Sequence, residues 1–297
     1  MIKRILYLLF VVIVVACTPQ KTPIEPVLIV EGWIENEGHP TVMLHYSIVM
    51  GEKYDSISEL MMDKLVSLGK VTISDGYESV VLTGGLDTNY MPPYKYTSTH
   101  IIGQVGETYT IEVEYEDKIV TAQTTIPEPV FFDSIKVQQS ENNDSVIHLF
   151  GYLTDSDVEK ENYYVLFYRY RGDKQYMNCF LGVFSDDDVD DRGVICMPIY
   201  RNVALSTIGL EDIEGFNPSR FFKPWDKLDI KLTTVDSLGY RFWSEFSAMS
   251  TTSRIAFMPV YTNVYSNIEG GKGYWIGYGE KVYPLTLKRD TVIRYTK

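Results

Sequence analysis

The chain has 297 residues, of which 40 are acidic and 27 are basic, so its formal net charge is −13. An acidic surface repels phosphate backbones, and this charge therefore argues against a protein that binds nucleic acid. The length suits one large domain or two smaller domains, each with its own hydrophobic core.

The first residues have the pattern of a bacterial lipoprotein signal. Lys3 and Arg4 form a basic start, residues 5–15 are uniformly apolar, and a small residue precedes Cys17. The apolar run is short for a bilayer span, which favours a signal peptide over a transmembrane helix. We expect residues 1–16 to be removed and Cys17 to carry lipid, because several acyl chains on one residue anchor a protein firmly. The alternative is an ordinary secretory signal with a chance cysteine.

Residues 17–26 are then the lipidated cysteine and a short tether. The segment after Cys17 reads TPQKTPIEP, which contains prolines and no apolar periodicity, as is typical of a spacer. It lacks the paired acidic residues that direct some lipoproteins to the surface. This segment therefore leaves open whether the lipid-anchored protein lies at the cell surface or on the periplasmic leaflet.

Residues 27–127 are predicted to form an immunoglobulin-like or transthyretin-like β-sandwich, since short strand-like runs follow one another at regular spacing. Asp75 and Gly76 predict a tight hairpin. One insert has helical spacing and predicts a short helix; its apolar residues are Ile57, Leu60, Met61, Leu65 and Leu68. The predicted strands are 27–34, 41–46, 71–74, 79–82, 96–102, 107–115 and 119–126.

Pro127 and Pro129 predict a boundary, because two prolines one residue apart stop a strand and stiffen the joint. Residues 128–297 are predicted to form a second β-rich domain with one short helix. Ser237 is predicted to cap that helix, whose apolar stripe is Leu238, Phe242, Phe246 and Met249. The predicted strands are 144–153, 163–171, 174–184, 228–236, 273–279, 281–287 and 291–295. The fold class is therefore mostly β.

Cys179 and Cys196 flank an acidic loop, as the two arms of a hairpin would. In a compartment outside the inner membrane they could form a disulfide bridge. The alternative is a pair of buried thiols.

The acidic loop between these cysteines has carboxylates at alternate positions. Asp186, Asp188 and Asp190 have a spacing that can converge oxygens on calcium. An EF-hand needs glycine at its sixth position and glutamate at its twelfth, where this chain has Asp191 and Met197. A looser calcium loop is therefore the alternative to a solvated acidic hairpin tip, which we favour.

No familiar catalytic motif occurs in the sequence. His39, His45, His100 and His148 are scattered, and there is no HExxH, no GxSxG and no phosphate-binding loop. Acidic pairs are abundant, but any two carboxylates are weak evidence for acid–base catalysis in an acidic β protein. We therefore expect no enzymatic activity and no cofactor.

Aromatic side chains are frequent, with 23 tyrosines. They gather in two regions, one containing Tyr90, Tyr94 and Tyr96 and one containing Tyr261, Tyr265, Tyr274, Trp275 and Tyr278. Exposed rings could stack on sugars or pack against a protein partner. The alternative for each ring is packing in the core or across strands.

Several segments occur in a characteristic order along the chain. They are the lipobox ending at Cys17, LIVEGWI at 28–34, VTISD at 71–75, VGETY at 105–109, NYY at 162–164, and the stretch from Phe242 through NIEGG at 267–271 to GYG at 277–279. By these segments the chain resembles a family of outer-membrane lipoproteins of Bacteroidota, known as domain of unknown function 4249. The resemblance covers nearly the whole mature chain and supplies no catalytic residues.

Members of that family are often encoded beside TonB-dependent receptors. The resemblance therefore implies a non-enzymatic lipoprotein that assists such an outer-membrane barrel in capturing or admitting a ligand. The alternative is a stand-alone surface lipoprotein that binds a glycan or a protein, as an adhesin does. An enzyme would need a polar pocket holding carboxylates or histidines with perturbed pKa values.

Replacing the lipidated residue tests the predicted anchor. We expect Cys17→Ala to release the protein from the membrane fraction, because lipid on this residue is the predicted attachment. The measurement is immunoblotting of membrane and soluble fractions, with Cys196→Ala as the control that keeps Cys17. Retention of Cys17→Ala in the membrane would contradict lipid anchoring.

Overall fold

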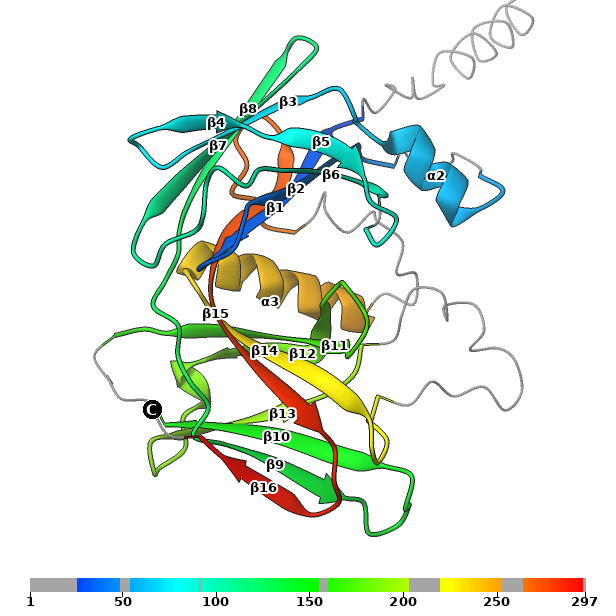
Figure 1. Cartoon of the computed structure of the whole chain (residues 1–297), viewed down its shortest axis with the longest axis vertical. Helices are drawn as coiled ribbons and strands as arrows, with labels where there is room; N and C mark the ends of the chain where they lie inside the picture. The colour runs from blue at the N-terminus through cyan, green and yellow to red at the C-terminus, as the bar shows by residue number, and fades with distance from the viewer. Residues whose placement is uncertain are drawn as a thin grey trace, which may run out of the picture.

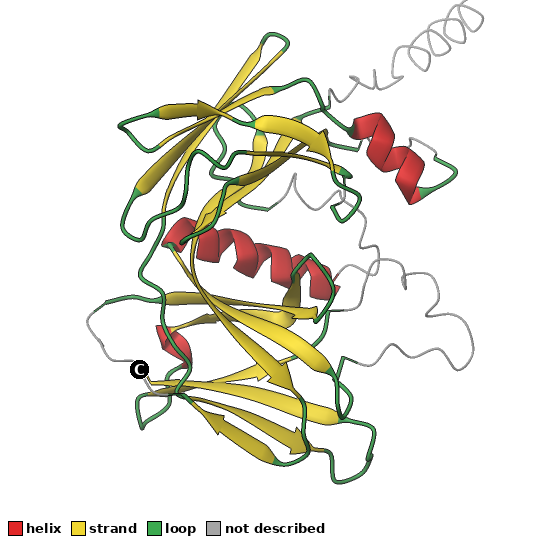
Figure 2. Ribbon diagram, in the orientation of Figure 1, coloured by secondary structure: helices red, strands yellow, loops and turns green. Residues whose placement is uncertain are grey.

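A computed structural model of the chain describes residues 26–48, 54–90, 92–154, 160–202, 220–252 and 264–295. The predicted signal peptide and nearly all of the tether lie outside these residues. Within them the fold is mostly β, as predicted, with two α-helices, one of them short (Figure 2). None of the described helices is both long enough and apolar enough to cross a membrane.

The elements follow one another as two groups of strands, each with one α-helix. The first group comprises β1 (Leu28–Glu35), β2 (Thr41–Tyr46), α2 (Ile57–Lys64), β3 (Lys70–Ser74), β4 (Ser79–Val81), β5 (Thr83–Leu86), β6 (Tyr94–Thr97), β7 (Thr108–Tyr115) and β8 (Lys118–Thr125). The second comprises β9 (Ser134–Gln139), β10 (Ile147–Thr154), β11 (Tyr163–Tyr170), β12 (Met177–Ser185), the 3-10 turn η1 (Asp186–Asp188), β13 (Val194–Ile199), β14 (Lys227–Val235), α3 (Ser237–Thr252), β15 (Lys272–Thr286) and β16 (Thr291–Arg294).

One sheet of eight strands runs through both groups. Its order is β12-β11-β14-β15-β1-β2-β6-β5, and two sheets of four strands, β4-β3-β7-β8 and β13-β10-β9-β16, pack against its two ends. Strand β15 is the link, since it pairs in parallel with β1 and antiparallel with β14. Figure 1 shows it passing from the upper half of the molecule into the lower half.

The N-terminal core lies between the sheet β4-β3-β7-β8 and the β1–β2 end of the large sheet. It contains apolar side chains of β1, β2, β3, β7 and β8, together with Trp275 from β15. Trp275 is fully buried, and its indole nitrogen donates to the Tyr109 carbonyl oxygen at 2.8 Å. A residue from the end of the chain therefore completes the first core.

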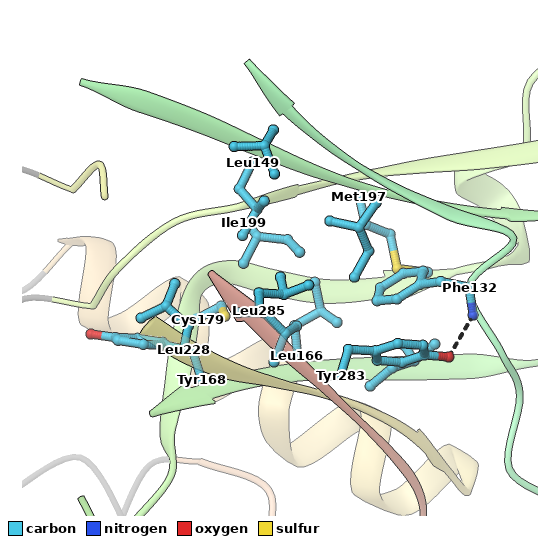
Figure 3. Close-up of a cluster of buried hydrophobic side chains, with 14 of the residues drawn as sticks. Phe132, Leu149, Leu166, Tyr168, Cys179, Met197, Ile199, Leu228, Tyr283 and Leu285 are labelled. Carbon is cyan, nitrogen blue, oxygen red and sulfur yellow. Dashed lines mark hydrogen bonds between the residues drawn. The ribbon is translucent and has the colours of Figure 1, made fainter. Parts of the chain in front are cut away.

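The C-terminal core lies between the sheet β13-β10-β9-β16 and the other end of the large sheet. Figure 3 shows its side chains from both layers, including Leu149 and Met197 on one side and Leu166 and Leu285 on the other. The Phe132 amide donates to the Tyr283 hydroxyl at 2.8 Å, and burial raises the pKa of Tyr283 to about 12. The polar tip of this core tyrosine is therefore satisfied by backbone.

Helix α3 covers the opposite face of the large sheet, between the two halves of the molecule (Figure 1). Phe242 and Trp243 are its buried residues, whereas Leu238, predicted to lie on the apolar stripe, is 40% exposed. The residue that caps α3 also differs from the prediction, by one position. Asp236 accepts from the Gly239 amide at 2.7 Å, so the carboxylate before Ser237 satisfies the first turn.

The other predicted local structures are present. Helix α2 occupies the insert, and Ser56 caps it by accepting from the Glu59 amide. Strands β3 and β4 form the hairpin around Gly76, whose φ is +89°. Strands predicted separately at 273–279 and 281–287 are one continuous strand, β15. The strands β5, β9 and β13 were not predicted.

The proline boundary predicted at residues 127–129 lies between the two cores, where the chain crosses β15. A Cβ atom at Gly279 would lie only 2.2 Å from the Pro127 carbonyl oxygen, so a side chain there would block the crossing. The residues before the boundary build most of the N-terminal core, but Ile268 and Trp275 from beyond it complete that core.

Gly273 provides a test of the pairing between β15 and β1. Its φ is +111°, and a Cβ atom would lie 1.9 Å from the Val30 carbonyl oxygen. We expect Gly273→Ala to lower the free energy of unfolding by about 1–3 kcal/mol from backbone strain alone. Thermal unfolding by circular dichroism measures it. Gly85→Ala is the control, because nothing lies within 4 Å of a Cβ there, and equal melting temperatures for both variants would refute the constraint.

Candidate functional site

A cleft of about 680 Å³ lies on the α3 side of the large sheet. Its walls come from β1 and β2 on one side, from β11, β12 and β14 on the other, and from α3 and β15 between them. The volume lies within the range of pockets for small ligands. Side chains from both halves of the molecule therefore meet in one site, which we call the aromatic cleft.

Strand alternation explains which side chains reach this cleft. Successive residues of a strand point to opposite faces, so every second residue of each strand lies on the same side of the sheet. On β1 this side presents Trp33 and Glu35, and on β14 it presents Asp229 and Lys231. Because Phe167 of β11 pairs directly with Lys231, residues far apart in the sequence become neighbours.

A buried lysine between two carboxylates forms the floor of the cleft. The Lys231 side chain is 6% exposed and its Nζ atom forms ion pairs with Glu35 and, at 3.2 Å, with Glu280. Burial raises the pKa of Glu280, and the nearby Lys231 opposes that shift. The lysine also lies 4.3 Å from the centre of the Tyr176 ring. The three strands β1, β14 and β15 are thus joined by charge.

A second ion pair lies beside the first. The Arg169 guanidinium donates to the Asp229 carboxylate at 2.9 Å and lies 4.4 Å from the centre of the Tyr176 ring. Burial raises the pKa of Tyr176 to about 12, so the phenol is neutral at physiological pH. Tyr176 therefore contacts two cations that the protein itself supplies.

The walls of the cleft are aromatic. Trp33 and Tyr90 form one wall, with ring centroids 6.3 Å apart and an angle of 31° between the planes. On the other wall, the Trp243 indole nitrogen donates to the Tyr278 hydroxyl at 2.9 Å. Burial raises the pKa of Tyr278 as well. The polar atoms of Trp243 and Tyr278 are thus bonded to each other, which leaves their rings as apolar surface.

Hydrogen-bonding groups line the rim. The Asn202 amide donates to the Asn178 side-chain oxygen at 3.0 Å. His39 has its Nδ1 atom 3.1 Å from the Ile101 carbonyl oxygen, so the neutral ring carries its proton there and presents Nε2 as an acceptor. The cleft thus combines ring faces with both donors and acceptors, an arrangement suited to holding a polar organic ligand.

Another cleft, of about 550 Å³, lies between β8 and residues 265–269. Its lining is mainly threonine, serine, asparagine and glutamine side chains together with Tyr265 and the exposed Leu238. The aromatic cleft has more ring surface and the buried charges, so it is the stronger candidate.

The predicted aromatic clusters divide between site and core. Tyr90, Tyr274 and Tyr278 line the aromatic cleft. Trp275 lies in the N-terminal core with Tyr94 and Tyr96 packed in or against it. Tyr265 is partly buried against α3, and Tyr261 lies outside the described residues. Some of these rings therefore line a candidate binding site, and others pack in the core.

A disulfide bridge and a pair of buried thiols were both left open for Cys179 and Cys196. In the structure both are free thiols, Cys179 buried and Cys196 exposed. Their strands belong to different sheets. Cys179 points from β12 into the C-terminal core, where burial raises its pKa, and Cys196 faces outward from β13. The sequence suggested two arms of one hairpin, but the chain changes sheets between them, which directs the thiols apart.

The calcium alternative for the acidic loop finds no support in the structure. Asp186 accepts from the Asn162 amide, Asp188 from the Ser185 amide, and Asp190 from Arg192. These carboxylates therefore bond different neighbours and do not converge on one point. Within the described residues no group of three or more His, Cys, Asp or Glu side chains could hold a metal ion.

The four histidines lie apart, as their spacing suggested. His45 is buried and bonds Glu31 at 3.0 Å, and His148 packs against Phe150 and Phe221. His100 bonds Ser98, which leaves His39 as the histidine that reaches the aromatic cleft.

The charged floor of the cleft was missed by sequence reasoning. In the β14 sequence KLDIKLTTV, apolar residues alternate with Asp229, Lys231 and Thr233, a pattern that indicates one wet face. In the structure both faces of β14 are buried. The available signal was two opposite charges two residues apart in a strand of a β-rich domain, which is too common to identify a site.

Lys231 gives a test of the charged floor. We expect Lys231→Met to destabilise the protein by about 2–3 kcal/mol at neutral pH, because two partly buried carboxylates lose their buried cation. A carboxyl group with a raised pKa binds its proton more tightly in the folded state, so stability is lost as pH rises through that pKa and regained as pH falls.

The deficit of Lys231→Met should therefore be smaller at about pH 5 than at about pH 8. Urea unfolding of the mature protein at both pH values measures it. The matched control is Lys174→Met, since Lys174 is exposed at the rim of the cleft, and we expect its effect to stay within about 0.5 kcal/mol. A deficit independent of pH would show that Lys231 acts by packing alone.

The chain matches the model of a known protein family. The family model described as a domain of unknown function, DUF4249, matches residues 16–283, which include every residue that lines the aromatic cleft. No curated protein matches the chain. Because the match extends over most of the sequence, the chain belongs to the DUF4249 family.

Proposed function

We propose that this protein is a non-enzymatic, lipid-anchored binding protein of the outer membrane, and that it holds its ligand in the aromatic cleft. In this proposal it works beside a TonB-dependent barrel and presents or admits the ligand to it. The lipid on Cys17 keeps the cleft close to the membrane, on whichever leaflet the protein resides.

The observation that carries the proposal is the aromatic cleft itself. It brings Trp33 and Tyr90 from the N-terminal half against Tyr176 and Trp243 from the C-terminal half, around a volume of about 680 Å³. Concave sites lined by aromatic side chains with a few fixed polar groups are the usual form of a ligand site. Because residues from both halves of the molecule line the cleft, ligand binding would depend on the whole fold.

The charges on the cleft floor support binding over catalysis. Lys231 is engaged by Glu35 and Glu280, and Arg169 is engaged by Asp229. Glu280 has a raised pKa, as a catalytic carboxyl group can have, but it pairs with Lys231 and is not among the residues that line the cleft. These ion pairs are better suited to fixing the strands that carry the aromatic walls.

The lipoprotein signal and the family resemblance support the location and the partner. The basic start, the apolar run and Cys17 are the features of a lipidated export product. A lipid anchor confines the protein to the membrane surface, where a nearby barrel meets it at high effective concentration. Capture and transfer of a ligand then need only a weak contact between the two proteins.

Co-purification tests the partner. We expect the native lipoprotein, isolated from detergent-solubilised outer membranes, to bring down a TonB-dependent receptor in stoichiometric amount, as measured by quantitative mass spectrometry. The control is an unrelated lipoprotein of the same membrane, carrying the same tag. Recovery of the lipoprotein alone would contradict the barrel partnership and favour a stand-alone surface protein that binds a glycan or a protein.

A further inference from the structure

The chemistry of the aromatic cleft limits what it can hold. We infer that its ligand is a neutral, hydroxyl-rich oligosaccharide that stacks on Trp33 and Tyr90. This inference rests on the proposed function, since it takes the aromatic cleft as the ligand site, and it adds the class of ligand.

The first argument is that the charges on the floor of the cleft are already paired. Lys231 bonds Glu35 and Glu280, and Arg169 bonds Asp229, so an entering charge would have to displace one of these partners or stay unpaired. Burying an unpaired charge is costly. The net charge of −13 further disfavours an anionic ligand.

The second argument concerns cationic ligands, which aromatic clefts often hold. Here the protein fills such positions itself. Lys231 and Arg169 both lie over the Tyr176 ring, and Lys95 lies 4.5 Å from the centre of the Tyr90 ring. A cationic ligand would meet these cations at close range, so the site disfavours it.

The third argument is the aromatic wall. Trp33 and Tyr90 are both partly exposed, and their planes are inclined by only 31° with centroids 6.3 Å apart. Two neighbouring, partly exposed rings therefore offer apolar ring surface on this wall. The C–H face of a pyranose is flat and apolar, and successive sugar units could pack on successive rings.

The fourth argument is the rim. Asn178 and Asn202 bond each other through one amide hydrogen and one oxygen, so each side chain keeps further hydrogen-bonding capacity. His39 adds an acceptor nitrogen, and Gln175 adds another amide. A sugar hydroxyl both donates and accepts, and neutral amides match it without a charge that must be desolvated.

The test is a titration of the lipoprotein, purified in mild detergent, with oligosaccharides. Binding is measured by tryptophan fluorescence and by isothermal titration calorimetry. The neutral probes are maltoheptaose, cellohexaose, xylohexaose and mannohexaose. Oligogalacturonate and chitosan oligomers are the anionic and cationic comparisons, and a pool of neutral nonapeptides is the non-sugar comparison.

We expect at least one neutral oligosaccharide to bind and Trp33→Ala to weaken that binding about tenfold or more. Trp33→Phe should restore much of the affinity, because it keeps a ring, and Tyr90→Ala tests the same wall from a loop. Trp225→Ala is the matched control, since Trp225 is 64% exposed and lies outside the cleft lining. Circular dichroism of each variant verifies folding.

Three results would overturn the inference. Tighter binding of the charged oligosaccharides than of the neutral ones would refute neutrality. Binding of the nonapeptides, lost in Trp33→Ala, with no response to sugars would refute the ligand class while leaving the cleft as the binding site. If no probe shows binding that is weakened by Trp33→Ala, the cleft is not the ligand site. The barrel partnership is tested separately by co-purification.

Discussion

The parallel pairing of β15 with β1 is the contact on which the rest of the structure depends. It joins residues 29–35 to residues 272–278, so two segments far apart in the sequence lie side by side in the centre of the large sheet. The remainder of β15 pairs with β14, which makes one strand a member of both halves. Without this pairing, the N-terminal core would lose Trp275 and the aromatic cleft would lose its continuous floor.

The two faces of this joint have different chemistry. One face of β15 supplies Trp275 to the N-terminal core, and the other supplies Tyr274 and Tyr278 to the apolar cluster that packs against α3. Near the second face, charged side chains are tolerated because each has a partner, as Lys231 has in Glu35 and Glu280. Such pairs add little net stability, but they require three strands to be in register. We infer that these ion pairs hold the strands in the positions that form the aromatic walls.

Local patterns in the sequence predicted much of the fold. Alternation identified β7, Asp75 and Gly76 identified the β3–β4 hairpin, and helical spacing identified α2 and α3. The errors lie where tertiary contacts override local preference. Asp236 caps α3 in place of Ser237, and the free thiols of Cys179 and Cys196 lie in different sheets. The aromatic cleft was anticipated only as a tendency of tyrosines to cluster.

The sequence by itself determined the β class, the acidic character and the kinship with the DUF4249 family, and it predicted a lipoprotein signal, because these depend on composition, on local periodicity and on residue order. Only the tertiary structure decided which aromatic rings are core and which line a site, and that Lys231 meets Glu35 from a strand about 200 residues away. Strand alternation specifies two faces, but which face is covered depends on the partner strands. That choice is made by long-range pairing, which local sequence patterns do not encode.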